Sequence, residues 1–132
     1  MKVALLGPLV AAVIAGGAWA SAHHSFAATY DENQTVEIQG RLVQFQFRNP
    51  HSFVHVDAPD EHGQMWRWAV EWGGAAQLGS QGVTGETLRP GDEVTIVGNP
   101  GRRPEDHRIR MRALRRVSDG FGWGQRPDEV FD

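Results

Sequence analysis

A chain of 132 residues without a single cysteine is long enough for one domain with its own hydrophobic core and too short for two. The lack of cysteine excludes disulfides, iron–sulfur clusters, thiolate–zinc sites and cysteine nucleophiles. A formal net charge of −3 at pH 7 argues against general nucleic-acid binding, because such binding depends on a basic surface.

The first 22 residues have the pattern of a secretory signal peptide. Lys2 is the only charged residue before an apolar run over residues 3–18, and the small residues Ala20, Ser21 and Ala22 follow. A positive start, an apolar stretch and a small-residue cleavage site together predict export and removal of this segment. An uncleaved membrane anchor is the alternative, but the run is shorter than the roughly 20 residues that a span needs. We therefore expect a mature protein that is periplasmic or secreted.

Alternation of apolar and polar residues predicts five strands. The first covers residues 35–47 and changes phase near Gly40 and Arg41, since Val36 and Ile38 have one parity and Phe45 has the other. Such a change indicates a β-bulge or a sharp bend. The remaining strands are expected at residues 51–57, 64–72, 93–98 and 108–117.

The connections between these strands favour a particular fold. Residues 73–82 lie between glycines and allow a short helix, and Pro90-Gly91 predicts a type II turn before the fourth strand. Five strands, a bent first strand and a helix between strands three and four favour a mostly β fold, a small OB-like Greek-key barrel. A two-sheet sandwich is the alternative.

The domain division follows from these elements. We expect a signal peptide at residues 1–22, a β-barrel domain at 23–117 and a flexible C-terminal tail at 118–132. The tail is rich in glycine, although Phe121, Trp123 and Phe131 could dock on the barrel.

The histidines are the first candidates for chemistry. Cleavage after Ala22 would place His23 at the amino terminus, where its amine and imidazole can chelate one metal ion. Cleavage after Ala20 would place His23 third, a position that also chelates Cu(II). Nitrogen-rich ligation suits Cu(II), so His23, His24 and His51 are candidate metal ligands. The alternative is that His23 and His24 are a polar start to the mature chain.

Geometry limits which histidines can act together. His51 and His55 are four residues apart on one strand face, about 13 Å, so they cannot share one metal ion. His51 could join the amino terminus only if residues 25–34 fold back over the second strand. We expect His62 and His107 to be solvated loop residues.

Several short motifs occur in a characteristic order. They are His23-His24-Ser25-Phe26-Ala27-Ala28-x-Tyr30-Asp31, Gly40, Asn49-Pro50-His51, Trp68-Ala69-Val70-Glu71 and Leu88-x-Pro90-Gly91-Asp92-x-Val94. Between residues 21 and 98 the chain resembles a family of small exported bacterial proteins that share a domain of unknown function. The resemblance implies a periplasmic, barrel-like domain and no particular activity. It includes the candidate residues Trp68 and Glu71, whereas the arginine-rich stretch after Gly98 departs from it.

That arginine-rich stretch suggests a second kind of site. Arg108, Arg110 and Arg112 alternate with apolar residues, so one face of the fifth strand presents a row of guanidinium groups. Such a row can bind phosphate or carboxylate. A solvated strand face, protected by its charge, is the alternative that we favour.

The third strand carries aromatic residues on one face and a carboxylate on the other. Trp66, Trp68 and Trp72 could stack a sugar, a base or another flat ligand, but we expect this stripe to belong to the core. Glu71 lies on the opposite face and has no partner that the sequence reveals.

These observations favour a binding or accessory protein over an enzyme. We expect its partner to be a metal ion or a small ligand, with no nucleic acid and no stable membrane span after processing. The alternatives are an anionic-ligand binder that uses the arginine row and a copper-dependent oxidoreductase. The latter would use His23 and His51 with Tyr30 near the metal.

The export hypothesis makes a direct prediction. The processed protein should begin between Ser21 and His23 and should be recovered outside the cytoplasm, because residues 1–22 have the features of a cleaved signal. Intact-mass measurement identifies the first residue. A membrane-bound chain that retains residues 1–20 would contradict the prediction.

Overall fold

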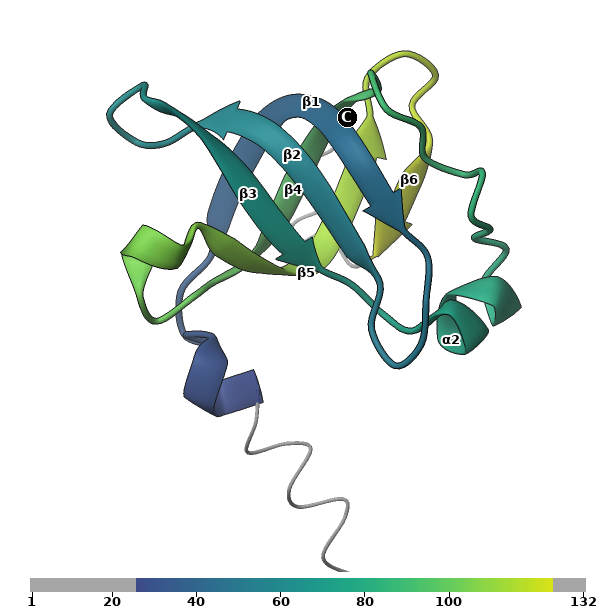
Figure 1. The fold of residues 1–132 in the computed structure, drawn as a ribbon, viewed down its shortest axis with the longest axis horizontal. Coiled ribbons are helices and arrows are strands. Elements are labelled where there is room, and N and C mark those ends of the chain that lie inside the picture. Colours follow the sequence, from purple (N-terminus) through teal and green to yellow (C-terminus); the bar gives the residue numbers. More distant parts are fainter. Residues whose placement is uncertain (1–25, 125–132) are drawn as a thin grey trace, which may run out of the picture.

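The structure, a computed structural model, describes residues 26–124, which form a mostly β barrel (Figure 1). Its strands are β1 (Val36–Gln46), β2 (Phe53–Pro59), β3 (Met65–Glu71), β4 (Glu93–Pro100), β5 (Arg108–Arg116) and β6 (Gly122–Gly124). Helix α2 (Ala75–Ser80) lies between β3 and β4, and the 3-10 helix η1 (Pro104–Asp106) lies between β4 and β5. A further helical turn covers residues 26–29.

Pairing between β3 and β5 closes the barrel. The strand order is β3-β2-β1-β4-β5-β6 with antiparallel neighbours, and β5 returns to pair in parallel with β3. Five strands joined in this way form the OB-type barrel, so the predicted fold class is confirmed, including the helix between the third and fourth strands. Three residue pairs make the closure, from Ala69–Arg108 to Glu71–Arg110. We call this contact the seam.

The predicted change of phase in the first strand exists, but it lies further along the chain than residues 40–41. Ile38 and Leu42 are both buried, so the alternation continues past the expected position. The register against β2 shifts between Leu42 and Gln44 instead. After the shift Phe45 packs against the core, which is how one extra residue reverses the face of a strand.

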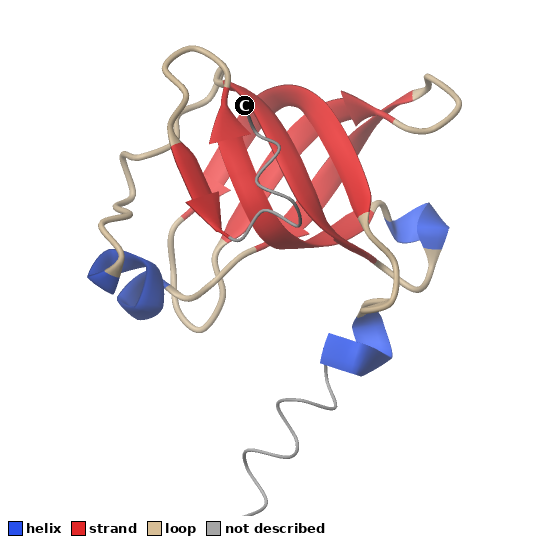
Figure 2. Ribbon diagram, turned by 180° about the vertical axis from the view of Figure 1, so that it is seen from behind, coloured by secondary structure: helices blue, strands red, loops and turns tan. Residues whose placement is uncertain are grey.

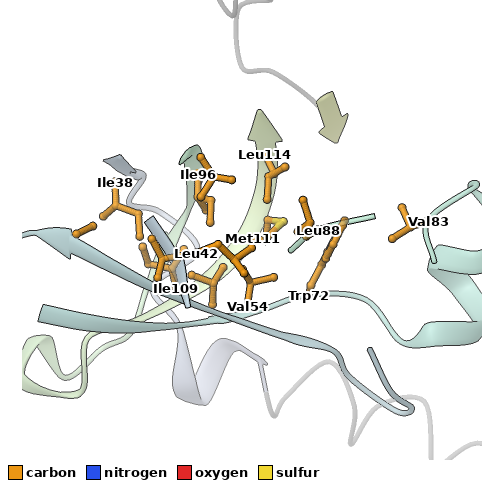
Figure 3. Close-up of a cluster of buried hydrophobic side chains, with 14 of the residues drawn as sticks. Ile38, Leu42, Val54, Trp72, Val83, Leu88, Ile96, Ile109, Met111 and Leu114 are labelled. Carbon is orange, nitrogen blue, oxygen red and sulfur yellow. The ribbon is translucent and has the colours of Figure 1, made fainter. Parts of the chain in front are cut away.

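The core fills the inside of the barrel (Figure 3). Val54 and Val56 of β2 are fully buried, because even-numbered residues of this strand face inward. Val83 and Leu88 join the cluster from the loop after α2, so that loop covers part of the core. The predicted turn before β4 is also present, since Gly91 has φ = 95°, as the third position of a type II turn requires.

Part of the expected C-terminal tail belongs to the fold. β6 pairs antiparallel with β5, with Trp123 opposite Leu114 (Figure 2). Phe121 and Trp123 pack against the core, and the Trp123 indole donates a hydrogen bond of 2.8 Å to Gln81. Phe131, the rest of the tail and the expected signal peptide lie outside the described residues.

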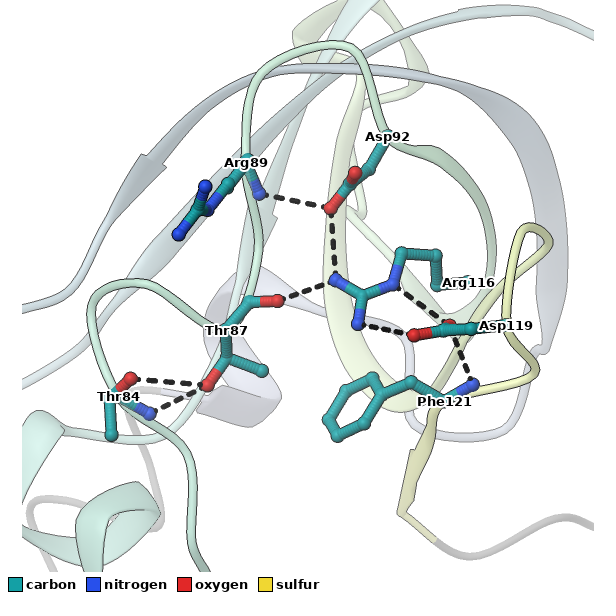
Figure 4. Close-up of polar contacts among 7 residues, drawn as sticks. All are labelled: Thr84, Thr87, Arg89, Asp92, Arg116, Asp119 and Phe121. Atoms are coloured by element: carbon teal, nitrogen blue, oxygen red, sulfur yellow. Dashed lines mark hydrogen bonds and ion pairs between the residues drawn. The ribbon is translucent and has the colours of Figure 1, made fainter.

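Arg116 joins the turn before β6 to the loop before β4 (Figure 4). Its guanidinium donates to both carboxylate oxygens of Asp119, to the carbonyl oxygen of Thr87 and to Asp92 Oδ2. The hydrogen bonds from Arg116 lower the pKa of Asp119 to about 2. A lowered carboxyl pKa contributes stability at pH values above the unfolded value and loses it as the pH falls toward 2.

Gly40 allows β1 and β2 to approach each other closely. A Cβ atom at this position would lie 2.1 Å from the carbonyl oxygen of Asp57 and 2.7 Å from Cβ of Ala58. Gly79, in α2, has nothing within 4 Å of the same added atom. The two glycines therefore form a matched pair for mutation.

We predict that Gly40→Ala lowers the free energy of unfolding by about 1–3 kcal/mol, because the backbone must shift to make room. Gly79→Ala should be neutral or raise it by up to about 1 kcal/mol, since alanine is the better helix former. Urea unfolding followed by tryptophan fluorescence measures both. Equal effects of the two substitutions on the free energy of unfolding would contradict the close approach of β1 and β2 at Gly40.

Candidate functional site

The seam brings charged residues together on the outer face of the barrel. Val70 and Ile109 pair across it and are fully buried, so their neighbours Glu71, Arg108 and Arg110 point outward. His51 lies just before β2, and its Nδ1 is 3.6 Å from Glu71 Oε1. The outer face of the seam thus combines one carboxylate, one imidazole and two guanidinium groups.

Residues 26–34, which we call the strap, lie alongside the end of β4. Tyr30 forms an isolated bridge with Gly101, and the Asp31 amide donates to the carbonyl oxygen of Pro100 at 2.9 Å. Arg102 donates to two strap carbonyl oxygens, from its amide to Thr29 at 2.9 Å and from Nε to Ala27 at 2.6 Å. Backbone pairing therefore holds the strap beside the seam.

Glu71 is the centre of the side-chain contacts between the strap and the seam. It is 9% exposed, and it accepts a hydrogen bond of 2.5 Å from the Tyr30 hydroxyl. Arg108 Nη2 lies 3.5 Å from the same carboxylate oxygen, Oε2. Burial of Tyr30, which is 1% exposed, raises the pKa of its phenol, and the hydrogen bond to the Glu71 carboxylate raises that pKa further. A buried carboxylate is thereby paired with two donors, as burial of a charge requires.

The predicted arginine row contacts the protein itself. Arg110 donates to Glu32 at 2.8 Å, and its guanidinium lies 4.0 Å from the centre of the Phe26 ring. Arg112 donates to Asn99 Oδ1 at 3.3 Å. Arg108, Arg110 and Arg112 thus contact β3, the strap and β4 respectively. Their guanidinium groups are paired within the protein, which favours intramolecular pairing over a free anion site.

His51 packs against the strap through an aromatic contact. Its ring meets the Phe26 ring edge-on, with centroids 5.5 Å apart. Because Nδ1 is directed toward Glu71, Nε2 is the ring nitrogen directed away from it. The His51 side chain is 42% exposed, so an external ligand can approach the imidazole.

The structure brings some candidate residues together and separates others. His51, Glu71, Arg108 and Arg110 meet at the seam, whereas Trp68 is directed to the inner face of β3 and packs against the core. His23 and His24 lie outside the described residues. Within residues 26–124, no three His, Asp or Glu side chains are grouped in a way that could hold a metal ion.

Two predictions about side-chain environments need correction. The tryptophan stripe is core at Trp72, which is 3% exposed, but Trp66 is 38% exposed, at the end of β3 that pairs with β2 and not with β5. His107 is not a solvated loop residue, because its ring stacks on Trp66 with centroids 4.2 Å apart. His62 is 80% exposed in its side chain, so the prediction for that residue is confirmed.

The fold and the seam define a small OB-like barrel with a short N-terminal strap tied to a buried glutamate. Residues 11–110 match the model of the Family of unknown function (DUF6152). The match covers more than half of the chain, so the chain belongs to that family. No curated protein matches it in sequence. No helix within residues 26–124 is long and apolar enough to cross a membrane.

One similar solved structure is the mitochondrial single-stranded DNA-binding protein of S. cerevisiae. The match has a TM-score of 0.46 and 13% sequence identity, and it covers 64% of this chain and 94% of the other.

The only tyrosine of the chain offers a direct test of the strap contact. Because the pKa of Tyr30 is raised, the folded protein should show no tyrosinate absorbance near pH 10, where an unburied tyrosine ionises. Glu71→Gln should lower this pKa, because it removes the neighbouring negative charge. Ultraviolet absorbance titration at 295 nm measures both.

The sign of the accompanying stability change is fixed by linkage. A raised phenol pKa contributes stability that is complete below pH 10 and is lost as the pH rises toward the folded value. Tyrosinate formation with an ordinary pKa in the folded wild-type protein would contradict the contact between Tyr30 and Glu71.

Proposed function

We propose that the mature protein is an exported binding or accessory protein that holds Cu(II) between its processed amino terminus and His51. The observation that carries this proposal is the contact between Phe26 and the His51 ring. A metal site shared with His51 requires the segment before β1 to fold back over the second strand. The contact between Phe26 and His51 meets this requirement for residues 26–34.

Chain length supports a shared site. His24 precedes Phe26 by two residues and His23 precedes it by three, and a chain spans at most about 3.3–3.6 Å per residue. The backbone that joins each of these two histidines to Phe26, which contacts His51, therefore spans at most roughly 7–11 Å. A terminal amine, the His23 imidazole and His51 Nε2 would provide three nitrogen ligands, a set that suits Cu(II).

Glu71 supports His51 as a ligand. Metal-binding histidines commonly direct their second ring nitrogen at a carboxylate, which fixes the ring and strengthens the metal bond. The Nδ1 of His51 is 3.6 Å from Glu71, an electrostatic contact that is longer than a hydrogen bond. Glu71 is itself held by Tyr30 and Arg108, so this support does not depend on solvent.

The two alternative functions have less support. The arginine row is engaged by Glu71, Glu32 and Asn99, so an anionic ligand would have to displace protein partners. An oxidoreductase would need Tyr30 beside the metal, and the Tyr30 hydroxyl is buried on the Glu71 carboxylate.

We predict that His51→Ala and His23→Ala each weaken Cu(II) binding at least about tenfold, because each removes a ligand of one ion. His62→Ala is the matched control and should leave affinity unchanged, since His62 is an exposed loop residue. Calorimetric titration of the processed protein gives the affinities, and electron paramagnetic resonance should show nitrogen hyperfine structure. Affinity should fall at acid pH, because copper binding requires deprotonated nitrogen ligands.

A one-residue extension ahead of the natural amino terminus is the sharpest control. It moves the amine and keeps every side chain, so it should weaken binding if the amine is a ligand. Unchanged affinity and spectrum in the extended protein would rule out the terminal chelate. Equal affinity of the His51→Ala and wild-type proteins would rule out the shared site.

A further inference from the structure

The strap presents two aromatic rings to the seam. Residues 26–29 form a helical turn, and the Tyr30 amide donates to the carbonyl oxygen of Phe26 at 2.7 Å. Residues four apart along a helical turn lie on one face of it, so Phe26 and Tyr30 are neighbours, with ring centroids 6.5 Å apart. The two rings therefore reach the barrel as a pair.

The arginine row of β5 matches this pair of rings. Cζ of Arg108 lies 5.7 Å from the centre of the Tyr30 ring, and Cζ of Arg110 lies 4.0 Å from the centre of the Phe26 ring. Every second residue of a strand lies about 6.6–6.8 Å further along it, which is close to the separation of the two rings. Two arginines on one strand face can thus each lie over one ring, an arrangement that attracts a cation to an aromatic face.

Arg110 contacts the strap on both sides of Tyr30. Besides lying over Phe26, it donates from Nη1 to Glu32 Oε1 at 2.8 Å. A planar guanidinium can stack on a ring and pair with a carboxylate at the same time. One side chain of β5 therefore holds the beginning of the strap and a residue near its end.

The contact between Arg110 and Phe26 bears directly on His51. The Phe26 ring has the guanidinium over its face, and it meets the His51 ring edge-on with centroids 5.5 Å apart. Phe26 is half-buried and lies outside the core cluster of the barrel. Its place beside His51 therefore depends on these side-chain contacts.

We infer that Arg110 is a positioning residue of the copper site, because it holds Phe26 against His51 and so keeps the amino terminus within reach of the imidazole. The inference rests on the proposed function and names the residue that brings the two halves of that site together. Copper that bridges the terminus and His51 binds molecules in which the strap is in place. The apparent Kd is then the intrinsic Kd divided by the fraction of such molecules, so a looser strap weakens binding without the loss of a ligand.

The test compares three variants of the processed protein: Arg110→Met, Arg110→Lys and Arg115→Met. Methionine removes the charge, whereas lysine keeps a cation that can lie over Phe26 or pair with Glu32. The Glu32 side chain is 46% exposed, so its carboxylate stays hydrated in Arg110→Met and the fold is retained. Arg115 provides the matched control, because it lies on the same strand and its side chain has no hydrogen bond or ion pair with the strap in the described part of the chain.

Arg110→Met should weaken Cu(II) binding about tenfold, as expected if the fraction of molecules with the strap in place falls to about one tenth. Arg110→Lys should restore part of the affinity, and Arg115→Met should leave it unchanged. The direction is diagnostic, because loss of a nearby positive charge would by electrostatics alone strengthen the binding of a cation.

Two further readouts distinguish positioning from a general loss of stability. In a His51→Ala background, Arg110→Met should have no additional effect, because the two substitutions remove the same interaction. The electron paramagnetic resonance spectrum of copper-loaded Arg110→Met should contain a component that matches the spectrum of His51→Ala.

A measurement without copper separates this inference from the proposed function. Nuclear Overhauser cross-peaks between the ring protons of Phe26 and His51 should be present in the metal-free wild-type protein and reduced in Arg110→Met. The inference is overturned if the cross-peaks persist at full intensity in that variant, or if the variant binds Cu(II) as tightly as the wild type while His51→Ala does not. Wild-type affinity in His51→Ala overturns the proposed function and this inference together, and reduced cross-peaks in Arg110→Met would then assign Arg110 to the strap alone.

Discussion

Parallel pairing over three residues, between the end of β3 and the start of β5, determines where chemistry is possible on this barrel. On the outer side it places Glu71 next to Arg108 and Arg110, which together bind the strap. Ahead of the pairing, β5 does not reach Trp66, so β3 has a neighbouring strand on one edge only and this end of the barrel stays open. A longer pairing would lengthen the charged face and would cover the free edge of β3, so both features depend on the short length of the seam.

The buried carboxylate of Glu71 makes the strap an integral part of the fold. A charge at 9% exposure is tolerated when hydrogen bonds and an opposite charge compensate for lost water. Arg108 supplies the charge, and Tyr30 supplies the short hydrogen bond. Detachment of the strap would leave Glu71 with one fewer partner and would expose the aromatic surface of Tyr30. The position of His51 beside this carboxylate is therefore set by groups that the fold itself requires.

Sequence patterns predicted the architecture better than the site. The five strands, the helix after β3 and the turn at Gly91 could be located because alternation and turn residues are local signals. The bulge lies further along the chain than the pattern predicts, because Gly40 serves the close approach of β1 to β2 and the register shifts between Leu42 and Gln44. The partners of Glu71 could not be found by pattern, since Tyr30 is 41 residues away. The exposure of Trp66 depends on where β5 begins to pair, which no property of β3 reveals.

The strap also fixes an order of assembly. Its partners come late in the chain: the bond from Arg102 to Ala27 spans 75 residues, and the ion pair of Arg110 with Glu32 spans 78. A chain that emerges amino terminus first exposes residues 26–34 long before β4 and β5 exist to receive them. Contacts of such long sequence separation form slowly, because the intervening chain must first be ordered. The strap, which is made before any strand of the barrel, is therefore among the last segments to reach its final position, and the surroundings of His51 are complete only in a molecule whose barrel has already closed.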